Sequence, residues 1–374
     1  MSLLPETLIL HKTTRKHYLS LTLGAESQVT YVWINEDKEN LLSKTRTLQQ
    51  EPAGIRDIPE WDTASNALNE KILVPVRMFR DPFALDPNKL VLCEVLTDKY
   101  VPTGNSQRSL CAKVTEEVKE FEPWFGMEQE YVLCGSDGKP YGRPAQGWKF
   151  RGVSCSVGSD NVYGRDISIC HYRACLYAGV KIGGTNSETL GSQWEFQVGP
   201  CEGTELGDHL WMARYILHRV CEDFDAVASL DVKPADESTT SGCHVNFSTK
   251  EMRSEGGLQY IEGAISRLSK HHSQHLCVYD PHGGADNKRR LTGQKTTSEF
   301  NKFSSAVGRR DVSVRIPGHV FRKGCGYFED RRPAANCDPF SVIKALLETC
   351  LLGATKQDDD KERETFKTFK NLHV

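Results

Sequence analysis

The chain has 374 residues, 38% of them hydrophobic, and a formal net charge of −3 from 47 basic and 50 acidic side chains. This length exceeds what one hydrophobic core usually supports, so the sequence predicts at least two domains. The charges are nearly balanced and no basic run with interleaved aromatic residues occurs, which argues against nucleic-acid binding. No stretch of 18 apolar residues is present, so we expect no membrane span.

Cysteine usage points to a reducing compartment. The 13 cysteines are odd in number, scattered, and contain no Cys-x-x-Cys pair. A disulfide framework or a zinc motif would show regular spacing. The first residues also lack the basic start and apolar core of a signal peptide. We therefore expect a cytoplasmic protein.

The N-terminal part of the chain predicts a small sheet. Residues 1–27 are weakly specified and are expected to form an arm or helix. β-branched and aromatic residues, bounded by turn signals, then predict four strands. These strands are expected at 28–34, 44–48, 71–76 and 90–96.

A proline- and glycine-containing break at 99–105 predicts the domain boundary. The expected organisation is an arm (1–27), an N-terminal domain (28–105), a catalytic domain (106–353) and a charged tail (354–374). Apolar residues at helical spacing predict helices in the catalytic domain. They are expected at 106–123, 168–178, 210–224, 257–271 and 340–351, with a turn at 283–287. In the segment 210–224, the predicted buried stripe ends at Phe224.

The most informative residues are two glutamates two positions apart, Glu128 and Glu130. In a strand they point to one face, while Met127, Gln129 and Tyr131 point to the other. Adjacent carboxylates repel, and a divalent metal is the usual compensation in a site of oxygen ligands. The alternative is an ordinary exposed polar face of a sheet.

The same alternation recurs downstream and favours the metal site. The segments 193–198, 312–316 and 327–331 each place charged or polar residues on one face and apolar residues on the other. The charged residues are Glu195, Arg315, Glu329 and Arg331. Solvent-facing strands usually carry Lys and Thr rather than isolated Glu and Arg. The sequence therefore predicts an α+β fold in which a curved sheet lines a funnel with its polar side.

The residue types favour phosphate chemistry. Carboxylates with a single histidine, His244, suit Mg²⁺ or Mn²⁺ better than a closed zinc site, although a lone histidine is more often structural. Arginines near such a metal can form forked hydrogen bonds to a phosphoryl group. No Gly-x-x-x-x-Gly-Lys-Ser/Thr loop is present. The residues alone predict a metal-dependent phosphoryl-transfer enzyme.

Four segments resemble the glutamine synthetase family, eukaryotic short-chain type, and the resemblance runs from about residue 28 to 352. They are WFGMEQEY (124–131), GTELGDH (203–209), RRLTG (289–293) and GYFEDRRP (326–333). The resemblance implies a small β-grasp-like N-terminal domain and a large α/β catalytic domain around a funnel. It also implies a homo-oligomer of two stacked pentameric rings, with active sites between neighbouring subunits. The implied reaction joins ammonia to the side-chain carboxylate of L-glutamate, using ATP and passing through γ-glutamyl phosphate.

The resemblance also implies roles for individual residues. The ligands of the metal that handles the nucleotide phosphates correspond to Glu128, His244 and Glu329. The ligands of the metal that orients the substrate carboxylate correspond to Glu130, Glu188 and Glu195. Substrate-binding residues correspond to Arg290, Arg310, Arg331 and His244, of which Arg310 and Arg331 are also catalytic. Nucleotide-binding residues correspond to Trp124, Arg315 and Tyr327.

Three departures from the family pattern concern the ammonium and glutamate side. Thr296 stands where the family's flap has the glutamate that helps to deprotonate ammonium. Thr239 and Thr240 stand in the run that contacts the glutamate backbone groups, and the latch that follows Trp61 is altered at 62–66. Turnover is therefore expected to be impaired.

Two other hypotheses remain open. One is an inactive subunit that binds Mg-ATP and assembles with an active paralogue. The other is a related ligase that uses a different amine.

Overall fold

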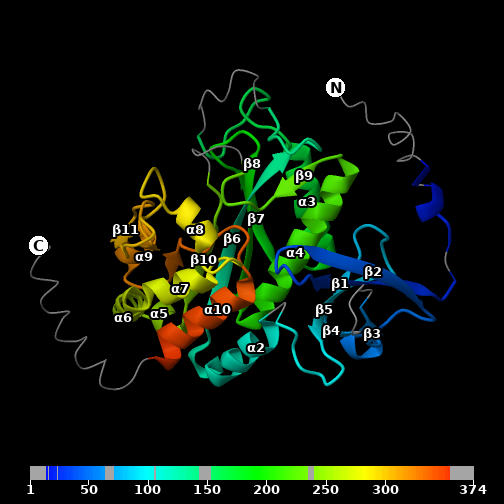
Figure 1. Cartoon of the computed structure of the whole chain (residues 1–374), viewed down its shortest axis with the longest axis horizontal. Coiled ribbons are helices and arrows are strands. Elements are labelled where there is room, and N and C mark those ends of the chain that lie inside the picture. The colour runs from blue at the N-terminus through cyan, green and yellow to red at the C-terminus, as the bar shows by residue number, and fades with distance from the viewer. Residues whose placement is uncertain are drawn as a thin grey trace, which may run out of the picture.

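The computed structural model describes residues 14–15, 17–22, 24–63, 71–104, 107–142, 153–234 and 240–353. A smaller sheet lies at one end of an elongated molecule, and a larger sheet with its helices makes up the rest (Figure 1). The predicted α+β class is confirmed. The domain boundary at residue 105 stays a prediction, and residues 105 and 106 lie outside the described ranges.

The smaller sheet is mixed and has the strand order β2-β1-β5-β4-β3. Its strands are β1 (Ser27–Ile34), β2 (Leu41–Leu48), β3 (Trp61–Asp62), β4 (Ile72–Arg80) and β5 (Lys89–Leu96), with a 3₁₀ turn at Ile55–Asp57. All four predicted strands are present. The predicted end of β4 at 76 is wrong, because pairing with β5 resumes after an irregularity between Pro75 and Arg77.

The two central strands of this sheet are buried on both faces. Tyr31 and Val91 lie in a core within the N-terminal unit. Val32 and Leu92 belong to the main core, which the catalytic unit dominates. The sheet is therefore packed directly on the larger unit, which explains the nearly continuous apolar runs of β1 and β5.

The larger sheet has the order β11-β12-β13-β10-β6-β8-β7, and β9 pairs with β6. Its strands are β6 (Trp124–Cys134), β7 (Ile182–Ser187), β8 (Gln193–Glu202), β9 (Val227–Ser229), β10 (Cys243–Ser248), β11 (Ser305–Val307), β12 (Val314–Ile316) and β13 (Phe328–Asp330). The predicted strands at 312–316 and 327–331 are present but shorter.

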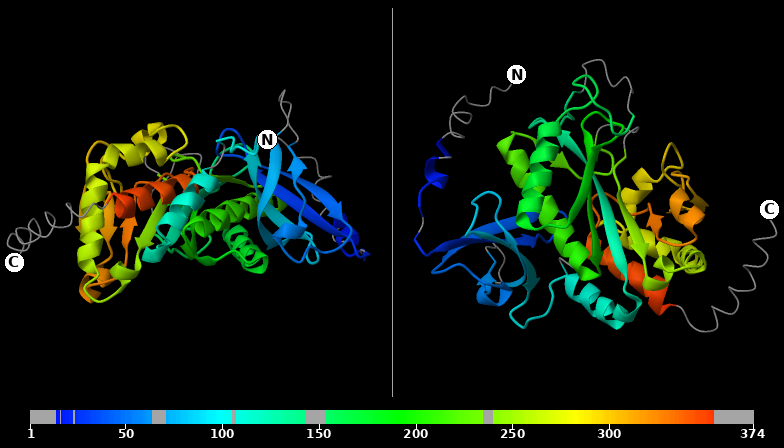
Figure 2. Two further views of the ribbon diagram at one scale, coloured as in Figure 1. Left: turned by 90° about the horizontal axis from the view of Figure 1, so that it is seen from below. Right: turned by 180° about the vertical axis from the view of Figure 1, so that it is seen from behind.

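Helices flank this sheet, and α3 and α4 pack on β7 and β8, respectively (Figure 2). The helices are α2 (Arg108–Glu117), α3 (Arg165–Ala178), α4 (Thr204–Asp223), α5 (Lys250–Arg253), α6 (Leu258–Lys270), α7 (His272–Val278), α8 (Ala285–Arg290), α9 (Gly318–Lys323) and α10 (Pro339–Leu347). A 3₁₀ turn (Lys119–Phe121) follows α2, and a π-helical turn (Glu348–Leu352) follows α10.

Several predicted helix bounds are wrong. The helix predicted at 210–224 begins earlier, at Thr204, so Gly207 lies within it. A β-carbon on Gly207 would come within 2.3 Å of the Phe340 ring, so this glycine allows α4 and α10 to approach closely. Phe224 is 39% exposed and lies outside the buried stripe. Between residues 107 and 123 only α2 and its 3₁₀ turn are helical. The turn predicted at 283–287 is present at 283–284, but residues 285–287 form the start of α8.

The predicted charged tail at 354–374 and most of the predicted arm at 1–27 lie outside the described residues. Within the residues that the structure describes, no helix combines the length and apolar character needed to cross a membrane.

A buried ion pair supports the sheet from the side opposite to its polar face. Arg332 donates to Asp330 at 2.7 Å, and both side chains are 0% exposed. Tyr279 donates to the same carboxylate at 2.8 Å, and His275 lies 2.6 Å from the Tyr279 hydroxyl. The interior holds these charges because each has a partner and further hydrogen bonds.

We expect Asp330→Asn to lower the free energy of unfolding by about 3–5 kcal/mol, because it leaves Arg332 charged and buried without its anion. Urea unfolding monitored by tryptophan fluorescence measures the change. The control is Glu116→Gln, which breaks an ion pair with Lys119 whose side chains are both 70% exposed. That change should cost less than about 1 kcal/mol. Equal losses in the two variants would contradict the prediction.

Candidate active site

The polar residues of the larger sheet gather on one face because of strand register. His244 lies opposite Glu128, and Glu195 lies opposite Glu130. Residues in register share a face, and residues two apart along a strand do the same. The alternate residues, such as Met127, Tyr131 and Phe196, are fully buried on the other face. The predicted polar face therefore exists and is built from neighbouring strands.

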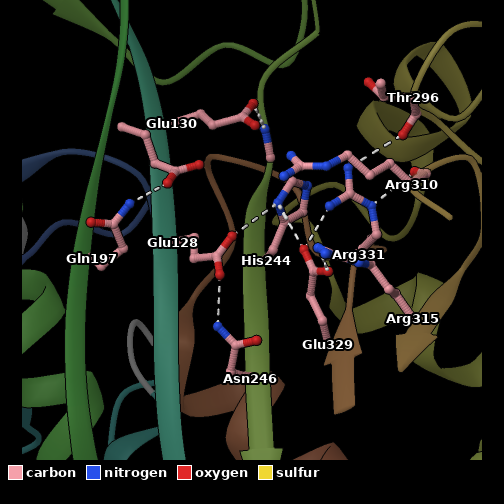
Figure 3. Close-up of polar contacts among 12 residues, drawn as sticks. Glu128, Glu130, Gln197, His244, Asn246, Thr296, Arg310, Arg315, Glu329 and Arg331 are labelled. Atoms are coloured by element: carbon pink, nitrogen blue, oxygen red, sulfur yellow. Dashed lines mark hydrogen bonds and ion pairs between the residues drawn. The ribbon is translucent and has the colours of Figure 1, made fainter. Parts of the chain in front are cut away.

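The first group of predicted metal ligands converges (Figure 3). His244 Nδ1 lies 3.7 Å from Glu128 Oε2 and 3.7 Å from Glu329 Oε1. Glu195, which was expected in the second group, also lies here: Glu128, Glu195 and His244 each offer one ligand atom, and these atoms lie within 4.8 Å of one another. One imidazole nitrogen among carboxylate oxygens is a donor set suited to Mg²⁺ or Mn²⁺.

The second group of predicted ligands is held by hydrogen bonds around it. The backbone N–H of Gly242 donates to Glu130 Oε2 at 2.8 Å. Glu188, which directly follows β7, accepts from Ser154 and from Asn186, each at 3.0 Å. These donors orient carboxylates that would otherwise turn away from one another.

The pKa shifts in this site favour the neutral forms of the carboxyl groups and of the imidazole. Burial raises the pKa of Glu130 to about 7, and the neighbouring carboxylate of Glu188 adds to the rise. The pKa of Glu195 is raised by burial and by Glu128, and the pKa of Glu188 is raised by burial. Burial and the nearby Arg331 hold the pKa of His244 well below its usual range. A bound divalent cation would favour ionised carboxylates and a neutral imidazole, so the donor set fits a metal.

Three further residues, for which the sequence alone predicted no role, position these ligands. Asn246 donates to Glu128 Oε1 at 2.7 Å, and Gln197 donates to Glu195. Each lies two positions after a ligand of its own strand, so the period of two was the available signal. Gly242 has another role, because a β-carbon there would come within 2.3 Å of Arg290 and 2.8 Å of His244.

The arginines approach from the β12 and β13 side of the sheet (Figure 3). Arg331 is 7% exposed and donates to Glu329 Oε1 at 2.6 Å, while Arg315 donates to Glu329 Oε2 at 2.9 Å. Arg331 also donates to the backbone carbonyls of Arg310 at 2.9 Å and Thr296 at 3.4 Å. These contacts join the Arg310 loop and the Thr296 loop to the first ligand group.

Arg290 lies beneath this layer rather than beside the other arginines. It is 2% exposed and donates to the backbone carbonyls of Arg331 and Arg332, each at 3.0 Å. Its Nη2 lies 3.3 Å from His244 Nε2. Its Nε has no hydrogen-bond partner among the described residues. Burial lowers the pKa of Arg290 to about 10.

The predicted nucleotide residues lie at the edge of the polar face. Trp124 begins β6, is 40% exposed, and has the Arg253 guanidinium 3.9 Å above its ring. Tyr327 precedes β13 and packs against His319, with 5.7 Å between ring centroids. An exposed aromatic ring beside a cation is a suitable surface for a flat base.

The three departures from the family pattern are only partly described. Thr296 is exposed, in the loop that follows α8. Thr240 accepts a hydrogen bond from Gln193 through its carbonyl at 2.9 Å, and Asp62 ends β3. Thr239 and residues 64–66 lie outside the described ranges.

The raised pKa of Glu130 predicts competition between protons and metal. In the metal-free protein this carboxyl takes up a proton below about pH 7, and the proton must leave before a cation binds. We therefore expect Mn²⁺ affinity to rise with pH up to about 7, and calorimetric titrations at several pH values will measure it. Glu130→Gln should bind Mn²⁺ more weakly and with a shallower pH dependence. An unchanged slope in this variant would contradict the assignment to Glu130.

Comparison with known proteins agrees with the site. Residues 105–367 match the family model described as glutamine synthetase, catalytic domain. The chain is 55% identical to a glutamine synthetase of Xenopus laevis over 92% of this chain and 91% of that protein. It is 53% identical to a glutamine synthetase of Homo sapiens, over 92% of this chain and 95% of the relative, and 52% identical to one of Gallus gallus with the same coverage. The chain belongs to the glutamine synthetase family.

Proposed function

We propose that this protein joins ammonia to the side-chain carboxylate of L-glutamate to form L-glutamine, with conversion of ATP to ADP and phosphate. The observation that carries the proposal is the convergence of Glu128, Glu329 and His244 beside Arg331 on one sheet face. A cluster of carboxylates that faces phosphate-directed arginines suits phosphoryl transfer to an acid. Membership of the glutamine synthetase family supports the same reaction.

The reaction has two steps. A side-chain carboxylate oxygen of glutamate attacks the γ-phosphorus of ATP, and ADP leaves. Ammonia then attacks the carbonyl carbon of the acyl phosphate, phosphate leaves with the bonding electrons, and one proton is lost from nitrogen. The phosphoryl group and the carboxylate are both anionic, so the site must supply positive charge to bring them together.

We assign the metal ligands in two sets. Glu128, His244 and Glu329 hold a cation at the nucleotide phosphates, and Glu130, Glu188 and Glu195 hold one at the substrate carboxylate. The family uses a divalent metal with ATP, and the oxygen-rich donor set supports Mg²⁺ or Mn²⁺. When bound, such cations neutralise charge on the phosphates and polarise the carboxylate.

Three of the arginines contact the substrates, and the fourth positions other residues of the site. Arg310 and Arg331 bind glutamate and stabilise the transferring phosphoryl group, and Arg315 contacts the nucleotide with Trp124 and Tyr327. Arg331 is the best supported, because its guanidinium is buried and directed at Glu329. His244 also borders the substrate. Arg290, although matched to a substrate-binding residue, is engaged with His244 and the backbone, which supports a positioning role for most of its guanidinium.

The inactive-subunit hypothesis has little support. An inactive subunit that binds Mg-ATP needs only the ligands of the nucleotide metal, yet Glu130, Glu188 and Glu195 of the second set are present as well. We further propose a cytoplasmic homo-oligomer of stacked pentameric rings, in agreement with the family resemblance. The 13 cysteines are all free, which supports a reducing compartment.

Steady-state assays test the proposed function. We expect ADP formation that requires Mg²⁺ or Mn²⁺, L-glutamate and ammonium together, and glutamine as the product. Glu329→Ala should abolish turnover because it removes one ligand and frees Arg331 and Arg315. ADP formation that does not depend on glutamate, or that persists in Glu329→Ala, would overturn the proposal.

The flap departure gives a separate prediction. Thr296 has no group that accepts a proton at neutral pH, whereas general bases contribute about 10²- to 10⁴-fold to a rate. We expect Thr296→Glu to raise kcat with ammonium by about tenfold or more. Thr296→Gln is the matched control because it has the same length without the charge. If the glutamine variant gains equally, the effect is not that of a base. If neither gains, Thr296 does not limit turnover.

A further inference from the structure

A second cluster of potential ligands joins the two units of the chain. Glu39 lies between β1 and β2, in the hairpin that reaches from the smaller sheet toward the helices of the larger unit (Figure 1). His282 precedes α8, and Asp286 lies in its first turn. Glu39, His282 and Asp286 each offer one ligand atom, and these atoms lie within 4.8 Å of one another.

The imidazole of His282 lies between the two carboxylates. Its Nδ1 is 2.6 Å from Asp286 Oδ2, and its Nε2 is 3.7 Å from Glu39 Oε2. Arg289 contacts the other oxygen of Asp286, Oδ1, at 3.2 Å. This hydrogen bond orients the Asp286 carboxylate toward His282, and carboxylates that bind a metal are often oriented in this way.

Asn336 provides an independent sign of a ligand. It lies in the segment before α10 and is 7% exposed. Its Nδ2 donates to Glu39 Oε1 at 2.8 Å and to Asp286 Oδ2 at 2.9 Å, so the amide points between the carboxylates. Its Oδ1 is buried and accepts no hydrogen bond from the described residues. Such unsatisfied buried oxygens are uncommon and need an explanation.

A half-turn of this amide would turn Oδ1 toward the two carboxylates and place the N–H groups of Nδ2 where the described residues leave Oδ1 without a partner. Oxygen and nitrogen of an asparagine amide are assigned from their hydrogen bonds, and with two anions in front the nitrogen faces them. A cation between the carboxylates would reverse the preference and bring Oδ1 into its coordination sphere. The donor set would then be one imidazole nitrogen, two carboxylate oxygens and one amide oxygen.

We propose that Glu39, His282, Asp286 and Asn336 form a site for a divalent transition metal that fastens the β1–β2 hairpin to the catalytic unit. Co²⁺ and Zn²⁺ bind a set of one imidazole and oxygen ligands more tightly than Mg²⁺ or Mn²⁺ does, here as in the His244 group. The site is separate from the proposed catalytic metals. It shares only α8 with them, because Arg290 at the other end of this helix contacts His244.

The competing occupant of the same position is a proton. A protonated His282 would bridge Glu39 and Asp286 as an ion pair without any metal. The two explanations separate in His282→Lys, which keeps a positive charge near both carboxylates but offers no ligand for a transition metal at neutral pH. His282 is about half-exposed, so the substitution is compatible with folding.

The test uses the full chain in excess Mg²⁺. Co²⁺ binding is counted by equilibrium dialysis with metal analysis, and the melting temperature is recorded with and without Zn²⁺. Metal that enters the catalytic sites is common to all variants, so only the differences between variants report on the second site. We expect the unmodified chain to bind about one more Co²⁺ per subunit than His282→Lys, and Zn²⁺ to raise its melting temperature more than that of His282→Lys.

Two further variants complete the design. Glu39→Gln removes a ligand from the exposed hairpin and should also lose the extra Co²⁺. His271→Gln is the matched control, because His271 is an exposed histidine whose Nδ1 lies 2.6 Å from Gln274, and it should behave like the unmodified chain. Equal Co²⁺ counts and Zn²⁺ shifts in the unmodified chain and His282→Lys would overturn the metal site and leave the protonated bridge.

Discussion

Repulsion among carboxylates on one face of the larger sheet is the constraint on which the rest of this structure depends. Strand register places these carboxylates on the same face, because Glu130 and Glu195 are directly opposite one another and Glu128 lies two positions before Glu130. Fixed donors partly offset the repulsion, among them the Gly242 N–H and the Asn246 amide. Burial and the neighbouring carboxylates raise the pKa of Glu130 and of Glu195 despite such donors, which supports cations as the missing partners.

The opposite face of this sheet must hold the ligand-bearing strands in register. The strand β13 shows how closely the two requirements are coupled, since Glu329 faces the ligand cluster and its neighbour Asp330 is buried in an ion pair with Arg332. Beneath β6, Arg214 binds Gln129 and the carbonyls of Ala335 and Cys337. Buried polar networks of this kind are sensitive to any shift of their members, so they help to hold the ligand-bearing strands in register.

The two sides of the candidate active site differ in how well the chain preserves them. On the nucleotide side, every residue expected from the family resemblance is present, and Arg331 and Arg315 are already directed at Glu329. On the nitrogen side, an exposed Thr296 contributes its backbone carbonyl to Arg331 but no acidic side chain. Positive charge for phosphoryl transfer and a base for ammonium are separate requirements, so one can weaken while the other is retained.

Strand periodicity in the sequence was enough to predict the polar face, the pairs Glu128 with Glu130 and Glu329 with Arg331, and the central strands, because alternation within one strand is a local property. The family resemblance added Glu188 and divided the six ligands between two metals. Local patterns could not predict that Gly207 lies within α4. There the absence of a side chain leaves room for the Phe340 ring of a helix distant in the sequence. Nor could they place Arg290 under His244, or bring Glu39 of the hairpin to His282 and Asn336. Such contacts join residues far apart in the chain, and only the packing of one unit on the other decides them.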